Sequence, residues 1–363
     1  MQASLYQYLY LIAVILLTFS VMLSYDQTKI SSSSSRDKNR RRSLLVLTFI
    51  LIVTIGLRPI SGAFVDMMNY HTQYQLILGS PFRFTLVTDN FIFDNVFALF
   101  AANNIPEELF FLFVSAVYFG CMSWACVKLF PRDAYLAFVV YLGAFSTFSY
   151  ATNGIKAGAA ASIFLLAIAY REKKFLAIFF LWLSLGFHHS MLAPIVAYVM
   201  AYFYKKPNAY LSAWIACLTL AAAHVTFFQE FFSGFTDEHG AEYLTVDLLD
   251  KDVTGFRPDF ILYSAVPIFI GYYLIRKRYV VSEFYNFLWC TYTMTNCVFL
   301  LCTYGSYINR IAYLSWLMYP IVLLYPFVNT EWDNHPIVSK QYLKYAVYGH
   351  LGFTAFMTFI YYA

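Results

Sequence analysis

The sequence predicts an all-α integral membrane protein with about twelve membrane-spanning helices, and two observations lead to this prediction. Of its 363 residues, 61% are hydrophobic and only 12% are charged, whereas soluble domains carry about a quarter charged residues. The apolar residues also gather in runs that approach the ~20 residues a helix needs to cross a bilayer. Aromatic residues make up 21% of the chain, which is typical of helices that end in interfacial belts.

Twelve apolar runs are candidate spans, and several of them are short. They cover residues 4–24, 43–57, 107–130, 134–150, 154–170, 174–188, 191–204, 208–228, 257–275, 283–303, 309–328 and 343–361. We expect them to form a single transmembrane domain over residues 1–363, with long outer loops at about 58–106 and 229–256. Within the first loop, Phe91–Ala102 is apolar but too short to span, which predicts a re-entrant or interfacial helix.

The basic residues indicate how the spans are oriented. Most of the 24 Lys and Arg residues follow odd-numbered spans, as an alternating set of twelve helices requires. The positive-inside rule therefore makes this face cytoplasmic and predicts that both termini lie outside. The eighteen residues are Lys29, Arg36, Lys38, Arg40, Arg41, Arg42, Lys128, Arg132, Arg171, Lys173, Lys174, Lys205, Lys206, Arg276, Lys277, Arg278, Lys340 and Lys344.

Four of the remaining cations lie at the outer mouth of a span. Arg58 ends the second span, Lys156 opens the fifth, Arg257 opens the ninth and Arg310 opens the eleventh. A cation at helix depth costs ~2.5–3.5 kcal/mol on insertion scales unless it is paired or faces water. Each residue alone could extend to the lipid headgroups, but four at one level favour a shared anionic ligand. Guanidinium groups bind phosphate with two parallel hydrogen bonds, so we expect a lipid-linked phosphate or diphosphate.

Polar side chains on the same face could orient that ligand or accept a proton. Asp66 and Tyr70 follow the second span, and Asn153 and Asn309 precede the fifth and eleventh. A carboxylate such as Asp66 could serve as a general base toward an incoming hydroxyl.

Two histidines are further candidates for the base. His188 and His189 end the sixth span in the sequence LGFHHSMLAP. Imidazole can act as a general base near neutral pH; the alternative is a packed, hydrogen-bonded role. For His350, in the twelfth span, the packed role is the preferred interpretation.

Several function classes lose support because their motifs are missing. The chain has no P-loop, HExxH, GxSxG or DxD pair, and its six cysteines lack the spacing of metal ligands. We therefore expect no metal or cofactor. The basic residues are explained as orientation signals, so nucleic acid is not an expected partner.

Four segments resemble the EpsG-like branch of the Wzy-type polymerases of exopolysaccharide and O-antigen repeat units. They are GLRPISGAFVDMMNY, NGIKAGAAASIFLLAIAY, LGFHHSMLAPIVAY and YINRIAYLSWLMYP. Their order and predicted face match the family. This chain departs from it at Lys156, where Arg is usual, and at Gly158 and Ala159, where bulkier or polar residues are more common.

The resemblance implies a membrane-embedded, GT-C-like inverting glycosyltransferase of the bacterial cytoplasmic membrane. It would join undecaprenyl-diphosphate-linked oligosaccharides outside that membrane, with a chain-length regulator protein as a further partner. Arg58, Lys156, Arg257 and Arg310 would hold the diphosphate. His188, His189 or Asp66 would be the base, and the residues that orient sugar or phosphate would be Tyr70, Asn153 and Asn309.

Three other functions stay open at this stage. A flippase for the same lipid-linked glycan is disfavoured because transporters place their substrate residues near the midplane, and here the candidates lie at the outer rim. A ligase that transfers a finished glycan shares the chemistry and is not separable by sequence. A membrane O-acyltransferase also uses histidine, but the short loops on the predicted cytoplasmic face carry no matching residues.

Overall fold

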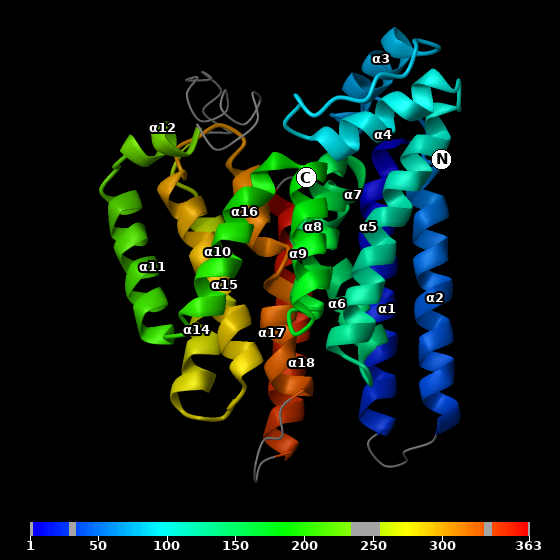
Figure 1. The fold of residues 1–363 in the computed structure, drawn as a ribbon. Helices are drawn as coiled ribbons and strands as arrows, with labels where there is room; N and C mark the ends of the chain where they lie inside the picture. Colours follow the sequence, from blue (N-terminus) through cyan, green and yellow to red (C-terminus); the bar gives the residue numbers. More distant parts are fainter. Residues whose placement is uncertain (1–2, 29–33, 234–254, 330–335, 362–363) are drawn as a thin grey trace. The chain divides into compact units, whose positions relative to one another are not determined.

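The computed structural model describes residues 3–28, 34–233, 255–329 and 336–361. All regular secondary structure within these ranges is helical (Figure 1). The chain divides into two compact units, of which unit 1 comprises Met1–His188 with Lys344–Ala363, and unit 2 comprises His189–Leu343. The predicted all-helical class is therefore confirmed for the described part of the chain.

Unit 1 is built around α5, which packs against α2, α4, α6 and α8. Figure 1 shows α3 and α4 lying across the ends of the upright helices α2 and α5. The helices of this unit are α1 (Tyr6–Thr28), α2 (Ser34–Gly56), α3 (Met67–Ile77), α4 (Phe91–Ala102), α5 (Glu107–Leu129), α6 (Ala134–Leu142), α7 (Phe145–Thr152), α8 (Ile155–Ala169), α9 (Lys174–Phe187) and most of α18 (Pro336–Phe356), which a π-helical turn (Met357–Tyr361) follows.

Unit 2 is built around α15, which packs against α10, α11, α14, α16 and α17. Trp289, Tyr285 and Tyr292 on α15 are fully buried, and each donates a hydrogen bond from its polar end to a backbone carbonyl of a neighbouring helix. The elements are η2 (His189–Met191), α10 (Leu192–Phe203), α11 (Pro207–Ala222), α12 (Phe227–Ser233), α14 (Pro258–Arg276), α15 (Glu283–Leu301), α16 (Ile308–Trp316) and α17 (Tyr319–Val328).

Every predicted span contains a helix, but only some of these helices are long and apolar enough to cross a bilayer. Four segments pass that test, namely Tyr6–Tyr25, Glu107–Leu129, Pro258–Arg276 and Ile308–Val328. Two bent pairs raise the number to six if each pair counts as one span. The two pairs are α6 with α7, bent by 76°, and α11 with α12, bent by 112°. This confirms a helical membrane protein, while the number of twelve spans stays a prediction.

Helix length explains part of the difference, because α2, α15 and α18 have 23, 19 and 21 residues and fail on hydropathy or charge instead. α8, α9 and α10 have 15, 14 and 12 residues, so at about 1.5 Å per residue they reach roughly 18–23 Å. The hydrocarbon core of a bilayer is ~30 Å thick. The predicted runs 154–170, 174–188 and 191–204 exceed these helices by only one or two residues, so these spans were already short as predicted. The predicted short helix at Phe91–Ala102 is confirmed as α4, with the same bounds.

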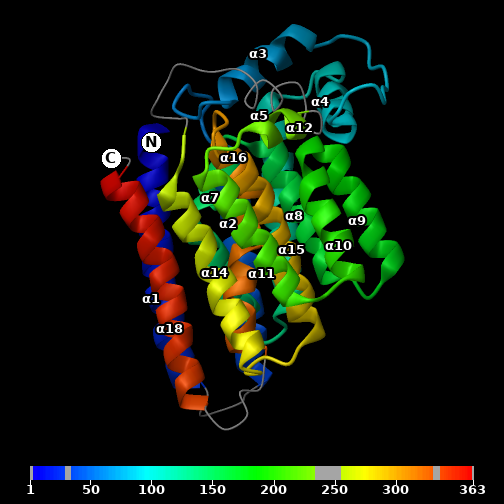
Figure 2. The same ribbon diagram turned by 90° about the vertical axis from the view of Figure 1, so that its left-hand side faces the viewer.

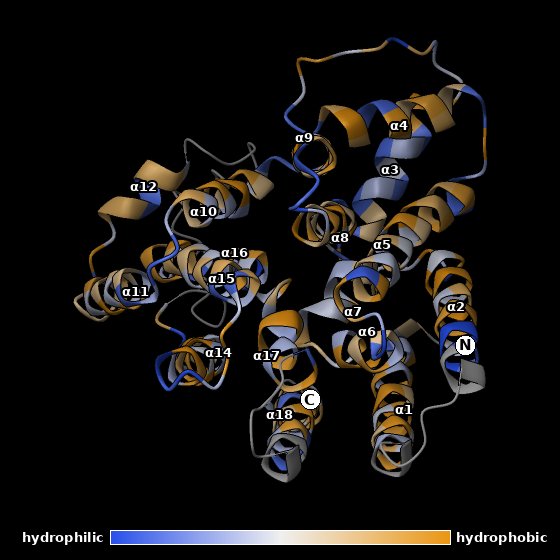
Figure 3. Ribbon diagram, turned by 60° about the horizontal axis from the view of Figure 1, so that its bottom comes forward, coloured by the Kyte–Doolittle hydropathy of each residue, from blue (hydrophilic) through white to orange (hydrophobic). Residues whose placement is uncertain are grey.

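The basic clusters of unit 1 lie at the opposite ends of the helices from α3 and α4 (Figure 1). Arg36–Arg42 lies within the first turns of α2, which extends further toward the N-terminus than predicted. This part of α2 is the hydrophilic end of the helix in Figure 3. Lys128 ends α5, and Arg171–Lys174 connects α8 to α9. The long loop predicted at 229–256 falls mostly on residues 234–254, outside the described ranges.

The last helix of unit 1 packs along the first. Figure 2 shows α18 and α1 side by side, and the rings of Phe19 and Tyr348 lie 5.2 Å apart between their centroids. His350 of α18 is 4% exposed, and its Nε2 lies 3.2 Å from the Val140 carbonyl oxygen. The packed role predicted for His350 is therefore confirmed.

The buried polar contacts of unit 2 generate a stability prediction. Asn296 is fully buried; it accepts a hydrogen bond from the Trp214 indole at 2.8 Å and donates one to Ser315 at 3.0 Å. Asn296→Leu leaves the buried Trp214 indole unpaired and removes one of the two hydrogen bonds of the Ser315 hydroxyl, which still donates to the Ala312 carbonyl. The change should cost about 1–2 kcal/mol, which thermal unfolding of the detergent-solubilised protein would measure. Asn286→Leu on the same helix is the matched control, because the Asn286 side-chain oxygen has no hydrogen-bond partner. Equal unfolding temperatures for the two variants would contradict the bridging role.

Candidate functional site

Arg58 is a buried cation in the connection that follows α2. Its side chain is 3% exposed. One guanidinium nitrogen donates to the Ile55 carbonyl and another to the Thr152 carbonyl, both at 2.8 Å. The guanidinium carbon also lies 5.2 Å from the ring centre of Phe64 and 5.5 Å from that of Phe111. Arg58 therefore joins the C-terminal ends of α2 and α7.

These contacts leave the positive charge of Arg58 without a carboxylate partner among the described residues. Its Nε is buried and has no hydrogen-bond partner. Burial lowers the pKa of Arg58 to about 10, which still leaves the guanidinium protonated near neutral pH. A buried charge of this kind costs several kcal/mol unless it is paired, so the position suits an anionic ligand.

Asn153 lies directly beside the Arg58 contact. It follows Thr152 at the end of α7, and its side-chain oxygen is buried without a hydrogen-bond partner. Buried polar atoms are nearly always paired, so an unpaired one calls for a ligand or an ordered water molecule. A hydroxyl of a sugar could donate to this oxygen. The structure therefore brings the predicted site residue Arg58 against the turn that carries another, Asn153.

Lys156 stands in the first turn of α8 and is paired. Its ammonium lies 3.1 Å from a carboxylate oxygen of Asp94 on α4, 5.0 Å from the ring centre of Phe93 and 5.9 Å from that of Tyr70. Tyr70 of α3 is thus brought to Lys156, as a shared site requires. Asp66, immediately before α3, is half-buried and makes no side-chain capping bond.

Gly158 explains one departure from the family pattern. A Cβ atom at this position would lie 2.5 Å from the carbonyl oxygen of Tyr150, because α7 and α8 form a tight pair joined by Asn153 and Gly154. The absence of a side chain lets the end of α7 approach α8. The following residue, Ala159, is fully buried. Small residues in α8 therefore set the geometry of the turn that Arg58 contacts.

The predicted cations of unit 2 are held differently. Arg257 donates to both carboxylate oxygens of Asp259, at 3.0 and 2.6 Å, and its guanidinium carbon lies 4.0 Å from the ring centre of Phe260. Asp259 therefore occupies the fork that a phosphate would need. Arg310 and the half-buried Asn309 lie in the first turn of α16.

The residue before α16 has an unusual backbone. Tyr307 adopts the left-handed conformation, with φ of 50°, which is rare for a bulky residue and often accompanies function. The Arg310 guanidinium carbon lies 5.5 Å from the ring centre of Tyr307. Thr303 and Ser306, in the same connection, are buried and their hydroxyls have no hydrogen-bond partner.

The two predicted histidines fall on different units. His188 ends α9 in an extended conformation and closes the first segment of unit 1, whereas His189 begins η2 and unit 2. Both are half-buried. The prediction that one of them acts as a base stays a prediction.

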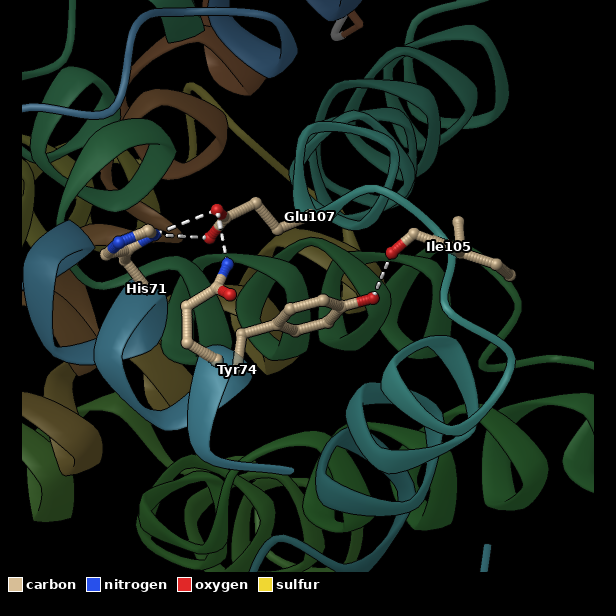
Figure 4. Close-up of polar contacts among 5 residues, drawn as sticks. His71, Tyr74, Ile105 and Glu107 are labelled. Carbon is tan, nitrogen blue, oxygen red and sulfur yellow. Dashed lines mark hydrogen bonds and ion pairs between the residues drawn. The ribbon is translucent and has the colours of Figure 1, made fainter. Parts of the chain in front are cut away.

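A third histidine, which the sequence did not single out, has a carboxylate partner. His71 of α3 places its Nδ1 at 2.8 and 2.9 Å from the two oxygens of Glu107, the first residue of α5 (Figure 4). Gln75 donates to the same carboxylate at 3.1 Å. The clue in the sequence was the helical spacing of Met67, Tyr70, His71 and Tyr74, which lay inside what was interpreted as a loop.

Comparison with known protein families identifies the family of this chain. The sequence profile of the EpsG family matches residues 41–362. The chain belongs to the EpsG family. Comparisons with curated proteins and with solved structures give no match.

This membership confirms the resemblance derived from the four motifs. The EpsG family is a family of Wzy-like polymerases, so the chain has the polysaccharide-polymerase type of role. The matched region covers all of unit 2, unit 1 from residue 41 onward except the last residue, and every predicted site residue. In the described residues, no group of three or more His, Cys, Asp or Glu side chains has the arrangement of a metal site.

The close approach at Gly158 generates a prediction. Gly158→Ala places a methyl group against the Tyr150 carbonyl and must displace α7, which carries the Thr152 and Asn153 contacts. We expect polymer synthesis to fall at least tenfold in cells that express the variant. Gly120→Ala in α5 is the matched control, because nothing lies within 4 Å of a Cβ there. Equal polymer yields from the two variants would show that this approach is unimportant.

Proposed function

We propose that this chain polymerises oligosaccharide repeat units carried on undecaprenyl diphosphate, at the outer face of the bacterial cytoplasmic membrane. The product would be an exopolysaccharide, capsule or O-antigen chain, formed by metal-independent inverting glycosyl transfer. The observation that carries the proposal is the buried guanidinium of Arg58, which has a free donor and no carboxylate partner in the described part of the chain. Family membership supplies the reaction class.

A diphosphate leaving group carries the negative charge that the buried guanidinium of Arg58 lacks. In an inverting transfer, negative charge develops on the diphosphate as the bond to the anomeric carbon breaks. A fixed guanidinium stabilises that charge more strongly away from water than in it. In this proposal, Arg58 neutralises the diphosphate and Lys156, released from Asp94, adds a second charge. Asn153 and Tyr70 orient phosphate or sugar.

The contacts in unit 2 indicate that Arg310 is better suited to bind phosphate than Arg257. Arg257 would have to give up Asp259 before it could bind phosphate, and that exchange replaces one anion with another. Arg310 lies beside the strained Tyr307, and we propose that it contacts phosphate while Asn309 orients the ligand. Asp66, His188 and His189 are the candidate bases that the sequence supplies, and they are the alternatives to any base proposed from the contacts in the structure.

The proposed membrane arrangement follows from the basic residues. It has about twelve spans in a GT-C-like architecture, both termini outside, and the outer layer formed by α3 and α4 above the lipid-linked substrate. The location of the basic clusters of unit 1 at the opposite helix ends supports this orientation. A regulator of chain length would be an additional partner.

Replacement of Arg58 tests the diphosphate-binding role. In cells that lack the gene, complementation with Arg58→Ala should leave surface glycan at a single repeat, because the leaving group loses its buried cation; a glycan gel measures the ladder. Arg58→Lys keeps the charge but not the two-carbonyl fork, and should give short, sparse polymer. The control is Arg171→Ala, since Arg171 pairs with the exposed Glu172 at the far end of α8. A full ladder from Arg58→Ala would remove the diphosphate role.

Replacement of Arg310 tests whether this cation of unit 2 contacts phosphate. Arg310→Ala should abolish polymer while the protein still elutes as a folded species in detergent, whereas Arg257→Ala should be less harmful because Asp259 already neutralises that cation. The same gel tests alternative functions. Repeat units that accumulate on the cytoplasmic leaflet in the deletion strain would identify a flippase, and full-length polymer left on the lipid carrier would identify a ligase.

A further inference from the structure

The contact between His71 and Glu107 has the geometry of an oriented base. Figure 4 shows the imidazole of α3 directed at the carboxylate with its second ring nitrogen turned away. The contacted nitrogen, Nδ1, lies 2.8 and 2.9 Å from the two carboxylate oxygens. A carboxylate accepts hydrogen bonds, so Nδ1 carries a proton and Nε2 of the neutral ring is left as the acceptor. This is the tautomer that a general base needs.

The carboxylate of Glu107 is held in one orientation by its surroundings. It is 7% exposed and opens α5, directly after Pro106. Free backbone N–H groups and the positive end of the helix dipole stabilise a carboxylate at this position. The Gln75 amide donates a further hydrogen bond to the carboxylate at 3.1 Å. A carboxylate fixed in this way holds the imidazole ring in one orientation.

His71 is accessible, unlike its partner. About a third of its side chain is exposed, at 33%, against 8% for Glu107. The ring therefore offers Nε2 to a ligand while Nδ1 remains engaged. A histidine that served only as packing would have both nitrogens enclosed, as in the case of His350.

His71 also lies next to the cationic part of unit 1. Its neighbour Tyr70 has the Lys156 ammonium 5.9 Å from its ring centre. Further charged groups near α3 are Asp94, which pairs with Lys156, Asp66, which lies one turn before Tyr70, and Glu108, which acts on Tyr74. A base on α3 and a cation at the start of α8 would thus act on two ends of one reacting centre.

We propose that His71 is the general base of glycosyl transfer and that Glu107 is its positioning residue, an inference that rests on the proposed function. In this step, the acceptor hydroxyl gives its proton to Nε2 of His71, and its oxygen forms a bond to the anomeric carbon of the donor. The bond between that carbon and the diphosphate oxygen breaks, and its electron pair leaves with the lipid diphosphate. The histidine later returns the proton to water.

The alternative is that the pair only fastens α3 to α5. A second contact of that kind allows the two roles to be separated. Tyr74, one turn after His71, donates a hydrogen bond to the Ile105 carbonyl at 2.6 Å (Figure 4). Burial, with Glu107 and Glu108 nearby, raises the pKa of Tyr74 above its ordinary value, so the hydroxyl stays a donor. Tyr74→Phe loosens α3 without touching the imidazole.

The experiment uses full-length protein reconstituted in vesicles. The probe is the undecaprenyl-diphosphate-linked repeat unit extracted from cells that lack the gene. His71→Gln keeps a hydrogen-bond donor toward Glu107 but provides no base, and should lower kcat by ~10²–10⁴-fold with KM within a factor of about three. Glu107→Gln should lower kcat less than His71→Gln does. Tyr74→Phe should stay within about threefold of wild type.

Chemical rescue distinguishes the loss of a proton acceptor from a loss of folded protein. His71→Gly opens space for a free base, and added imidazole should restore part of its kcat if the lost group is a proton acceptor. A kcat for His71→Gln close to wild type would overturn the base, as would a loss in Tyr74→Phe equal to that in His71→Gln. Failure of the wild-type protein to form polymer would overturn the proposed function, and this inference with it.

Discussion

Burial of the Arg58 guanidinium is the constraint on which the rest of unit 1 depends. Its two donated hydrogen bonds end on carbonyls at the C-terminal ends of α2 and α7. Such carbonyls lack partners within their own helices and carry the negative end of the helix dipole. One side chain thereby ties the ends of both helices together.

The magnitudes show that this arrangement compensates the charge only in part. A cation near a helix C-terminus gains about 0.3–1 kcal/mol, and up to ~2 kcal/mol in partly buried positions. Removing an ion from water costs several kcal/mol, and the two rings at 5.2 and 5.5 Å add attractions of about 1–2 kcal/mol each. Two dipoles and two rings therefore approach the cost without an anion, but Nε remains unpaired. A phosphate oxygen would satisfy that donor and supply the missing charge.

Close helix packing makes this geometry available. Gly56 lets α2 approach α5, since a Cβ there would lie 2.8 Å from the Leu112 Cα. Gly158 does the same for α7 against α8, and Gly186 for α9 against Ile92 of α4. In membranes, such small residues allow backbones to meet where the hydrophobic effect gives no preference for one apolar contact over another. These three approaches position the turns that carry Arg58, Asn153 and Asp94.

The sequence could predict the helices, the short outer helix and the cations at the helix ends, because apolar runs and charge distribution carry that information locally. It could not predict how each cation is compensated. The pairing of Lys156 with Asp94 joins residues 62 positions apart, and the contact of His71 with Glu107 needs α3 to fold back over α5. The bend of 76° between α6 and α7 was equally hidden, since both halves are apolar.

Arg257, Lys156 and Arg58 differ in how far their positive charges are already neutralised by neighbouring groups, and this difference indicates distinct roles. Arg257 already donates two hydrogen bonds to the carboxylate of Asp259, two residues away, so a phosphate would add little stabilisation there. Lys156 shares a part-buried carboxylate from another helix, with side chains 23% and 29% exposed. Water still reaches this pair, so it can open when a ligand arrives more readily than a fully buried pair could. Arg58 has backbone carbonyls alone. Of these three cations, it is the one for which an incoming diphosphate displaces no existing anion, which makes it the anchor of the leaving group and leaves Lys156 to close on it afterwards.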